Sequence, residues 1–172
     1  MALTYAGYML LAQQILGGRH KAVAVAALLF FFNGGLGFLY DFDLAFADHF
    51  ARVKEIFTGY YKTPANQPDL NLRFSNVIAD LMLPQRALLG GWTMGIPALY
   101  LLISSVREKS YRQTALLALW AAALPLVHTH TFLALALFSG GYLLGSLIEH
   151  RAERCGILLR AGLYLAVVLV LA

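Results

Sequence analysis

The chain has 172 residues, of which 60% are hydrophobic and only 13% are charged, and its mean hydropathy is +0.67. An ordinary soluble domain carries about 25% charged residues, so this composition excludes that class and indicates an integral membrane protein. The single cysteine, Cys155, excludes an internal disulfide and any cysteine metal cluster. A net charge of +4 could suit nucleic acid, but the distribution of the charges favours membrane topology, and we expect no nucleic-acid partner.

Apolar segments separated by glycine, proline or charged residues predict an all-α fold, a polytopic transmembrane helical bundle of about six spans. A helix needs about 20 apolar residues to cross the hydrocarbon core of a bilayer. The expected spans, all in one transmembrane domain over residues 1–172, are residues 2–16, 22–40, 85–105, 114–127, 131–148 and 156–172. The first stretch lacks a basic leader and a small-residue cleavage pattern, so it is interpreted as a span and not as a signal peptide. Because apolar sequence runs almost to both ends, we expect a piece of a larger membrane protein.

Residues 41–84 form the one long polar segment between the expected spans. Within it, apolar side chains recur at a spacing typical of one helix face, which predicts a short helix lying on the membrane interface over residues 44–57. The residues on that face are Leu44, Phe46, Phe50, Val53 and Phe57. Residues 58–70, which contain Pro64 and Pro68, are predicted to be a loop, and residues 71–83 are predicted to pack towards the bilayer.

Charge predicts which side each loop faces. The short loops, with the start of the last span, hold eight basic and three acidic residues, whereas the long segment and the start of the third span hold five basic and six acidic ones. Together these account for all 13 basic and 9 acidic residues. Basic loops stay in the cytoplasm, so we expect the short loops there and residues 41–84 on the outer face. The basic residues of the first group are Arg19, Lys21, Arg107, Lys109, Arg112, Arg151, Arg154 and Arg160.

This topology gathers candidate site residues at the outer ends of the spans. They are Asn33, Asp41, Asp43, Gln85, Arg86, His128 and His130. The planar fork of Arg86 suits a phosphate or carboxylate, and a histidine can donate a hydrogen bond, move a proton or bind a metal. Asp41 and Asp43 are candidate ligands for a divalent cation, Mg²⁺ or Mn²⁺, that would bridge a phosphate leaving group.

Each of these features also has a structural interpretation. Arg86 can extend to lipid headgroups and bind nothing else. The two histidines can form a hydrogen-bonded turn at the membrane interface, and Asp41-Phe42-Asp43 is an instance of a common pattern. The Asn33-Gly34-Gly35-Leu36-Gly37-Phe38 end of the second span can serve helix packing, because glycines permit close approach.

Three motifs carry a resemblance to a known family. They are Pro84-Gln85-Arg86 with Leu88-Leu89-Gly90, the Asn33–Phe38 glycine-rich end, and Leu124-Pro125-Leu126-Val127-His128-Thr129-His130-Thr131-Phe132. Over roughly residues 22–148 the chain resembles a family of uncharacterised polytopic membrane proteins. That family is similar to the GT-C glycosyltransferases, which include the protein O-mannosyltransferases.

The resemblance implies an enzyme that takes a sugar from a polyprenyl phosphate on the outer face of the membrane. Asn33, Gln85 and Arg86 would bind substrate, and Asp41, Asp43, His128 and His130 would carry catalysis. In such enzymes a catalytic carboxylate lies in the first outer loop, which this sequence lacks before the second span. Either that part lies upstream, or Asp41 and Asp43 correspond to a later acidic motif. A transporter or permease piece and a non-catalytic membrane scaffold are the alternative functions.

Overall fold

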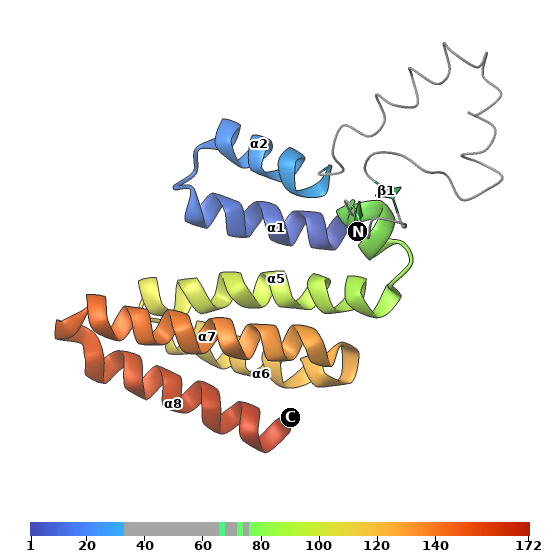
Figure 1. The fold of residues 1–172 in the computed structure, drawn as a ribbon. Coiled ribbons are helices and arrows are strands. Elements are labelled where there is room, and N and C mark those ends of the chain that lie inside the picture. The colour runs from blue at the N-terminus through green and yellow to red at the C-terminus, as the bar shows by residue number, and fades with distance from the viewer. Residues whose placement is uncertain (33–65, 68–71, 74–75) are drawn as a thin grey trace, which may run out of the picture. The chain divides into compact units, whose positions relative to one another are not determined.

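A computed structural model describes residues 1–32, 66–67, 72–73 and 76–172 (Figure 1). Apart from two paired strands of two residues each, all regular structure in these ranges is helical. The elements are α1 (Ala2–Ile15), α2 (His20–Phe31), β1 (Asn66–Gln67), β2 (Leu72–Arg73), the π-helix η2 (Val77–Met82), α5 (Arg86–Arg107), α6 (Tyr111–Val127), α7 (Thr129–Glu149), the 3-10 helix η3 (Arg151–Glu153) and α8 (Arg154–Leu171). They divide into two compact units, the first comprising residues 1–27 and 85–172 and the second residues 28–84.

Helix α5 lies at the centre of the first unit. It contacts α1, α6 and α7, and α6 in turn contacts α8. Figure 1 shows these helices lying side by side with their long axes close to parallel. Helix α1 runs in the same direction as α5, because Thr4 hydrogen-bonds Thr93 at one end and Gln14 donates to Ser104 at the other.

Small and branched side chains fill the core between α5, α6, α7 and α8. Ala98 and Leu102 of α5 pack with Leu117, Ala118 and Ala121 of α6, and all of them are buried. Short side chains at these positions let the helix backbones approach closely, which favours packing inside a membrane where water exclusion between helices gives no driving force. The core therefore fixes α5 and α6 as an antiparallel pair.

Among the described residues, three helical segments are long and apolar enough to cross a membrane: Arg86–Arg107, Thr129–Glu149 and Arg151–Leu171. The outward-facing leucines of the last two segments are largely uncovered, with Leu137 80% and Leu169 81% exposed. Continuous apolar surface of this kind is typical of a lipid-facing helix. This agrees with the expected all-helical membrane protein, whereas α1 and α2, at 14 and 12 residues, are shorter than a full crossing.

Several predicted boundaries shift. Helix α6 begins at Tyr111 and not at residue 114, because the Ser110 side chain accepts the backbone N–H of Gln113 and caps the helix there. Helix α7 begins at Thr129, two residues before the prediction, since His128 caps it. Helix α5 begins at Arg86, one residue after the predicted start, and ends at Arg107, two residues after the predicted end.

The second unit contains a strand pair that the sequence did not predict. Residues 58–70 were expected to be loop, but β1 within them pairs antiparallel with β2. Downstream, Val77 and Met82 of η2 are buried. That residues 71–83 pack towards the bilayer stays a prediction. The predicted interfacial helix over residues 44–57 lies outside the described residues.

Candidate functional site

The turn between α6 and α7 is built around His128. This residue ends α6 and begins α7 in an extended backbone conformation, with φ −160° and ψ 98°. Its Nδ1 accepts the backbone N–H of Thr131 at 3.3 Å and lies 2.8 Å from the Thr131 hydroxyl. A side-chain acceptor at this position satisfies one of the free N–H groups at a helix start. His128 is thus a helix cap, a role that its sequence motif did not reveal.

The capping bond determines which ring nitrogen of His128 remains available to a ligand. Because Nδ1 accepts a backbone N–H, the neutral His128 ring carries its proton on Nε2. Nε2 makes no hydrogen bond to any other residue in the described ranges, so it is free to donate to an oxygen of a ligand. The His130 ring lies next to it, with 5.5 Å between ring centroids and 40° between ring planes. His130 is exposed, whereas His128 is half-buried.

The histidine turn packs directly onto the first turns of α5. A Cβ built on Gly91 would lie 2.6 Å from Thr131 Oγ1 and 2.7 Å from His128 Cβ, and one on Gly95 would lie 2.6 Å from Thr131 Cγ2. Real Cβ atoms do not approach other atoms so closely, so only glycine fits at these two positions. The glycines therefore bring the histidine turn against the end of α5 that begins with Arg86.

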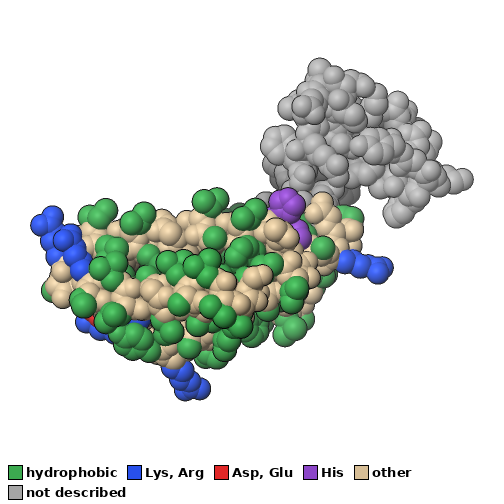
Figure 2. Space-filling model, turned by 90° about the horizontal axis from the view of Figure 1, so that it is seen from below, with side chains coloured by type: hydrophobic (Ala, Val, Ile, Leu, Met, Phe, Trp, Pro, Cys, Tyr) green, Lys and Arg blue, Asp and Glu red, His purple; other side chains and the backbone are tan. Residues whose placement is uncertain are grey.

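Arg86 is exposed in the first turn of α5. It forms no hydrogen bond or ion pair with another residue of the described part of the chain. Gln85, also exposed, precedes it as the helix N-cap without a side-chain capping bond. The structure thus brings Arg86, His128 and His130 to one end of the first unit. Figure 2 shows the visible histidines grouped near one end of the helices.

The remaining predicted site residues are not placed. Asn33, Asp41 and Asp43 lie outside the described residues. Within the described ranges, no group of three or more histidine, cysteine, aspartate or glutamate side chains could hold a metal ion. The predicted divalent cation site at Asp41 and Asp43 lies outside the described residues and stays a prediction.

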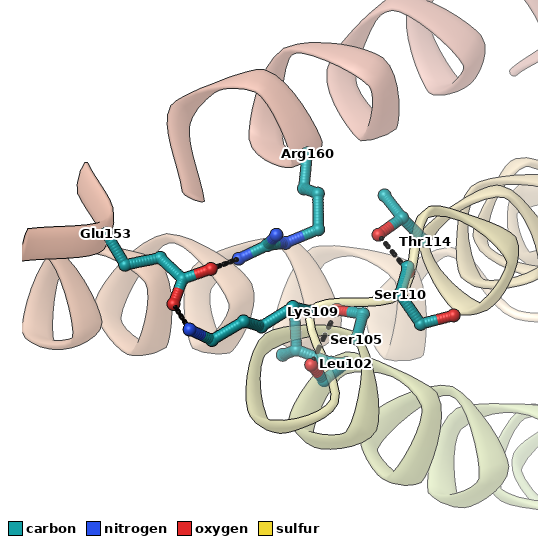
Figure 3. Close-up of polar contacts among 7 residues, drawn as sticks. All are labelled: Leu102, Ser105, Lys109, Ser110, Thr114, Glu153 and Arg160. Atoms are coloured by element: carbon teal, nitrogen blue, oxygen red, sulfur yellow. Dashed lines mark hydrogen bonds and ion pairs between the residues drawn. The ribbon is translucent and has the colours of Figure 1, made fainter. Parts of the chain in front are cut away.

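A second polar cluster lies at the opposite end of α5, and the sequence did not predict it (Figure 3). The Glu153 carboxylate forms ion pairs with Lys109, from the α5–α6 turn, and with Arg160 of α8, at 3.5 Å between Glu153 Oε1 and Arg160 Nη2. Arg160 is only 4% exposed, and its guanidinium lies 5.9 Å from the centroid of the Tyr111 ring. Glu153 and Arg160 are seven residues apart, two helical turns, and that spacing was the available signal.

Comparison of the chain with protein-family models, with curated proteins and with solved structures gives no match in any of the three cases.

Proposed function

We propose that the chain is a six-span integral membrane protein whose Arg86 end binds the phosphate of a polyprenyl-phosphate-linked sugar, as part of a GT-C-like glycosyltransferase. One observation carries the proposal. Gly91 and Gly95 allow the histidine turn to pack against the start of α5, where Arg86 is exposed and has no partner among the described residues. A free guanidinium fork and a free imidazole N–H at one bilayer depth are donors suited to phosphate oxygens.

The proposed reaction needs a base, an acceptor and a stabilised leaving group. A carboxylate, Asp41 or Asp43, removes the proton of an acceptor hydroxyl, and the hydroxyl oxygen bonds the anomeric carbon of the sugar. The bond between that carbon and the phosphate oxygen breaks, and the lipid phosphate leaves with the electron pair. Arg86 and the Nε2–H of His128, or His130 in its place, stabilise the charge on the departing phosphate.

Sidedness is part of the same proposal. The turns at residues 16–21, 107–112 and 149–154 share one end of the first unit: Arg107 donates to the Gln14 carbonyl, and Lys109 pairs with Glu153. Figure 2 shows most of the visible lysine and arginine side chains grouped away from the histidines. Basic turns stay in the cytoplasm, so the Arg86 and His128 end faces outward.

A labelling experiment tests this orientation. In a Cys155→Ser background, a cysteine at Gln67 is expected to react with a membrane-impermeant maleimide in intact cells. A cysteine at the exposed Arg112 is expected to react only after the cells are opened, because the basic turns lie inside. The reverse pattern would refute the outward placement of the Arg86 end and the function built on it.

Binding of a short polyprenyl phosphate, with the matching polyprenol as reference, tests the site itself. Arg86→Ala is expected to weaken binding of the phosphate by about tenfold, the loss of one charge-assisted hydrogen-bonded contact, and to leave binding of the alcohol unchanged. The affinity of Arg86→Lys for the phosphate should lie between those of the wild type and Arg86→Ala, because lysine keeps the charge and loses the planar fork. Native mass spectrometry of the protein in nanodiscs measures both ligands.

Arg112→Ala is the matched control, since it removes an exposed arginine from the opposite end of the bundle. Equal affinity of the wild type for the phosphate and the alcohol, or an Arg86→Ala variant that binds the phosphate normally, would reduce Arg86 to a headgroup anchor. The non-catalytic scaffold would then be the better description.

A further inference from the structure

Helix α1 ends in a glycine turn that leaves two of its carbonyls for side-chain donors. Gly17 and Gly18 adopt left-handed backbone conformations, with φ 63° and 74°. The Gly18 N–H returns to the Gln13 carbonyl at 3.0 Å, as in a Schellman motif. The nearby carbonyls of Gln14 and Leu16 accept hydrogen bonds from arginine side chains.

Two arginines from distant parts of the chain are anchored on these carbonyls. Arg107, the last residue of α5, donates from Nη1 to the Gln14 carbonyl at 2.8 Å. Arg19, just after α1, donates from Nε to the Leu16 carbonyl at 3.1 Å. The acceptors are two residues apart on a helix end that carries partial negative charge, which favours cations there. Both guanidinium groups are therefore anchored at the C-terminal end of α1, and neither is a freely moving surface side chain.

Most of the donor capacity of this pair is unused. A guanidinium has five N–H donors, and each of these two arginines is exposed and uses one donor in a bond to the described residues. Neither forms an ion pair with a carboxylate in the described ranges. Two acidic side chains of the neighbouring turns are engaged elsewhere: Glu108 accepts from Gln113 at 2.7 Å, and Glu153 pairs with Lys109 and Arg160.

The depth of the pair identifies its ligand. Arg107 closes the 22-residue candidate span of α5, and about 33 Å of helix takes it from one edge of a hydrocarbon core of about 30 Å to the other. Phospholipid headgroups lie at that level. We propose that Arg19 and Arg107 form a binding site for the phosphate of an anionic phospholipid at the basic end of the bundle. The site lies at the opposite end of α5 from Arg86 and does not depend on the proposed function.

The probe is spin-labelled phosphatidylglycerol, compared with spin-labelled phosphatidylcholine, around the full chain in phosphatidylcholine vesicles. Electron paramagnetic resonance gives the relative association of each lipid from its motionally restricted fraction. The wild type is expected to prefer phosphatidylglycerol by about fivefold or more, the effect of about one basic residue near an anionic headgroup. Arg19→Gln/Arg107→Gln should lose that preference, and excess inorganic phosphate should not displace the lipid from the wild type.

Arg151→Gln/Arg154→Gln is the matched control. Like Arg19→Gln/Arg107→Gln, it removes two positive charges from the basic end of the bundle. Arg154 is likewise anchored, on the Leu147 carbonyl at 2.8 Å, but Arg151 forms no such bond beside it within the described residues. This control should keep most of the preference. Equal loss in both double variants would show diffuse attraction and overturn the site, as would displacement of the lipid by inorganic phosphate.

Arg107 also joins α5 to α1, so its substitution can change the packing of these helices as well as the lipid site. Arg19→Gln alone is therefore the second variant. It changes only an exposed turn and should lower the preference at an unchanged melting temperature. A preference unchanged from the wild type in this variant would overturn the proposal without reference to the double variant.

Discussion

Glu153→Gln is expected to lower the melting temperature of the protein in detergent by about 5–10 °C, a large effect for a chain of this length. Arg160 keeps its positive charge at any accessible pH, and at 4% exposure it cannot regain water. The substitution leaves this buried cation with the Tyr111 ring and no carboxylate. A thermal unfolding series followed by circular dichroism measures the shift.

Two variants separate this explanation from a general loss of surface charge. Lys109→Gln removes the other partner of Glu153, but that side chain is 64% exposed, so its contribution should be close to zero. Glu153→Gln/Arg160→Met removes both charges and fills the space with a flexible apolar side chain, and it should recover most of the lost stability. A Glu153→Gln variant that melts with the wild type, or a double variant no better than the single one, contradicts the account.

Gly91→Ala is expected to destabilise the protein by about 1–3 kcal/mol, the usual result of overpacking a tight contact. The added methyl would have to displace both the Thr131 hydroxyl and the His128 Cβ, which lie against the α5 backbone. Unfolding of the wild type and the variant in a mixed-micelle titration measures the change in the free energy of unfolding.

Gly141→Ala is the control for Gly91→Ala. Gly141 lies within α7, and a methyl group added there would meet no described atom within 4 Å. The substitution should therefore stabilise by up to about 1 kcal/mol through helix propensity. If the two substitutions gave the same result, close approach at Gly91 would not be what positions the histidine turn.

The helices were predictable because apolar runs of this length have few alternatives. Their ends were less so, since a single side chain decides them: Ser110 starts α6 three residues early, and His128 starts α7 two residues early. The fourth span was expected to end at residue 127, and α6 does end at Val127, with Pro125 within its last turn. A proline near a helix end removes only one backbone bond, and its position in sequence does not show whether the helix continues past it.

Of the candidate site residues, Gln85, Arg86, His128 and His130 do lie at one end of the first unit, whereas Asn33, Asp41 and Asp43 lie outside the described residues. His128 was interpreted either as a group that acts on substrate or as part of a hydrogen-bonded turn, and its Nδ1 does bond to Thr131 in the α6–α7 turn. The Glu153–Arg160 pair was missed for a different reason. Glu153 was interpreted as part of a basic turn and Arg160 as a residue at the start of the last span, and no pairing between them was expected. Lys109, the second partner of Glu153, comes from the α5–α6 turn, where its backbone is left-handed (φ 56°). Backbone conformations of that kind are rare outside glycine and leave little trace in sequence.

The pairing of α1 with α5 has a consequence for biosynthesis. Thr4 and Gln14 find their partners, Thr93 and Ser104, only about ninety residues later in the chain. At a synthesis rate of about 5–20 residues per second, α1 waits roughly 5–20 s for α5 to leave the ribosome. Throughout that interval α1, a helix of 14 residues, carries two polar side chains whose final partners have not yet been made. We therefore expect α1 to reach its final packing only after α5, the third expected span, has been synthesised.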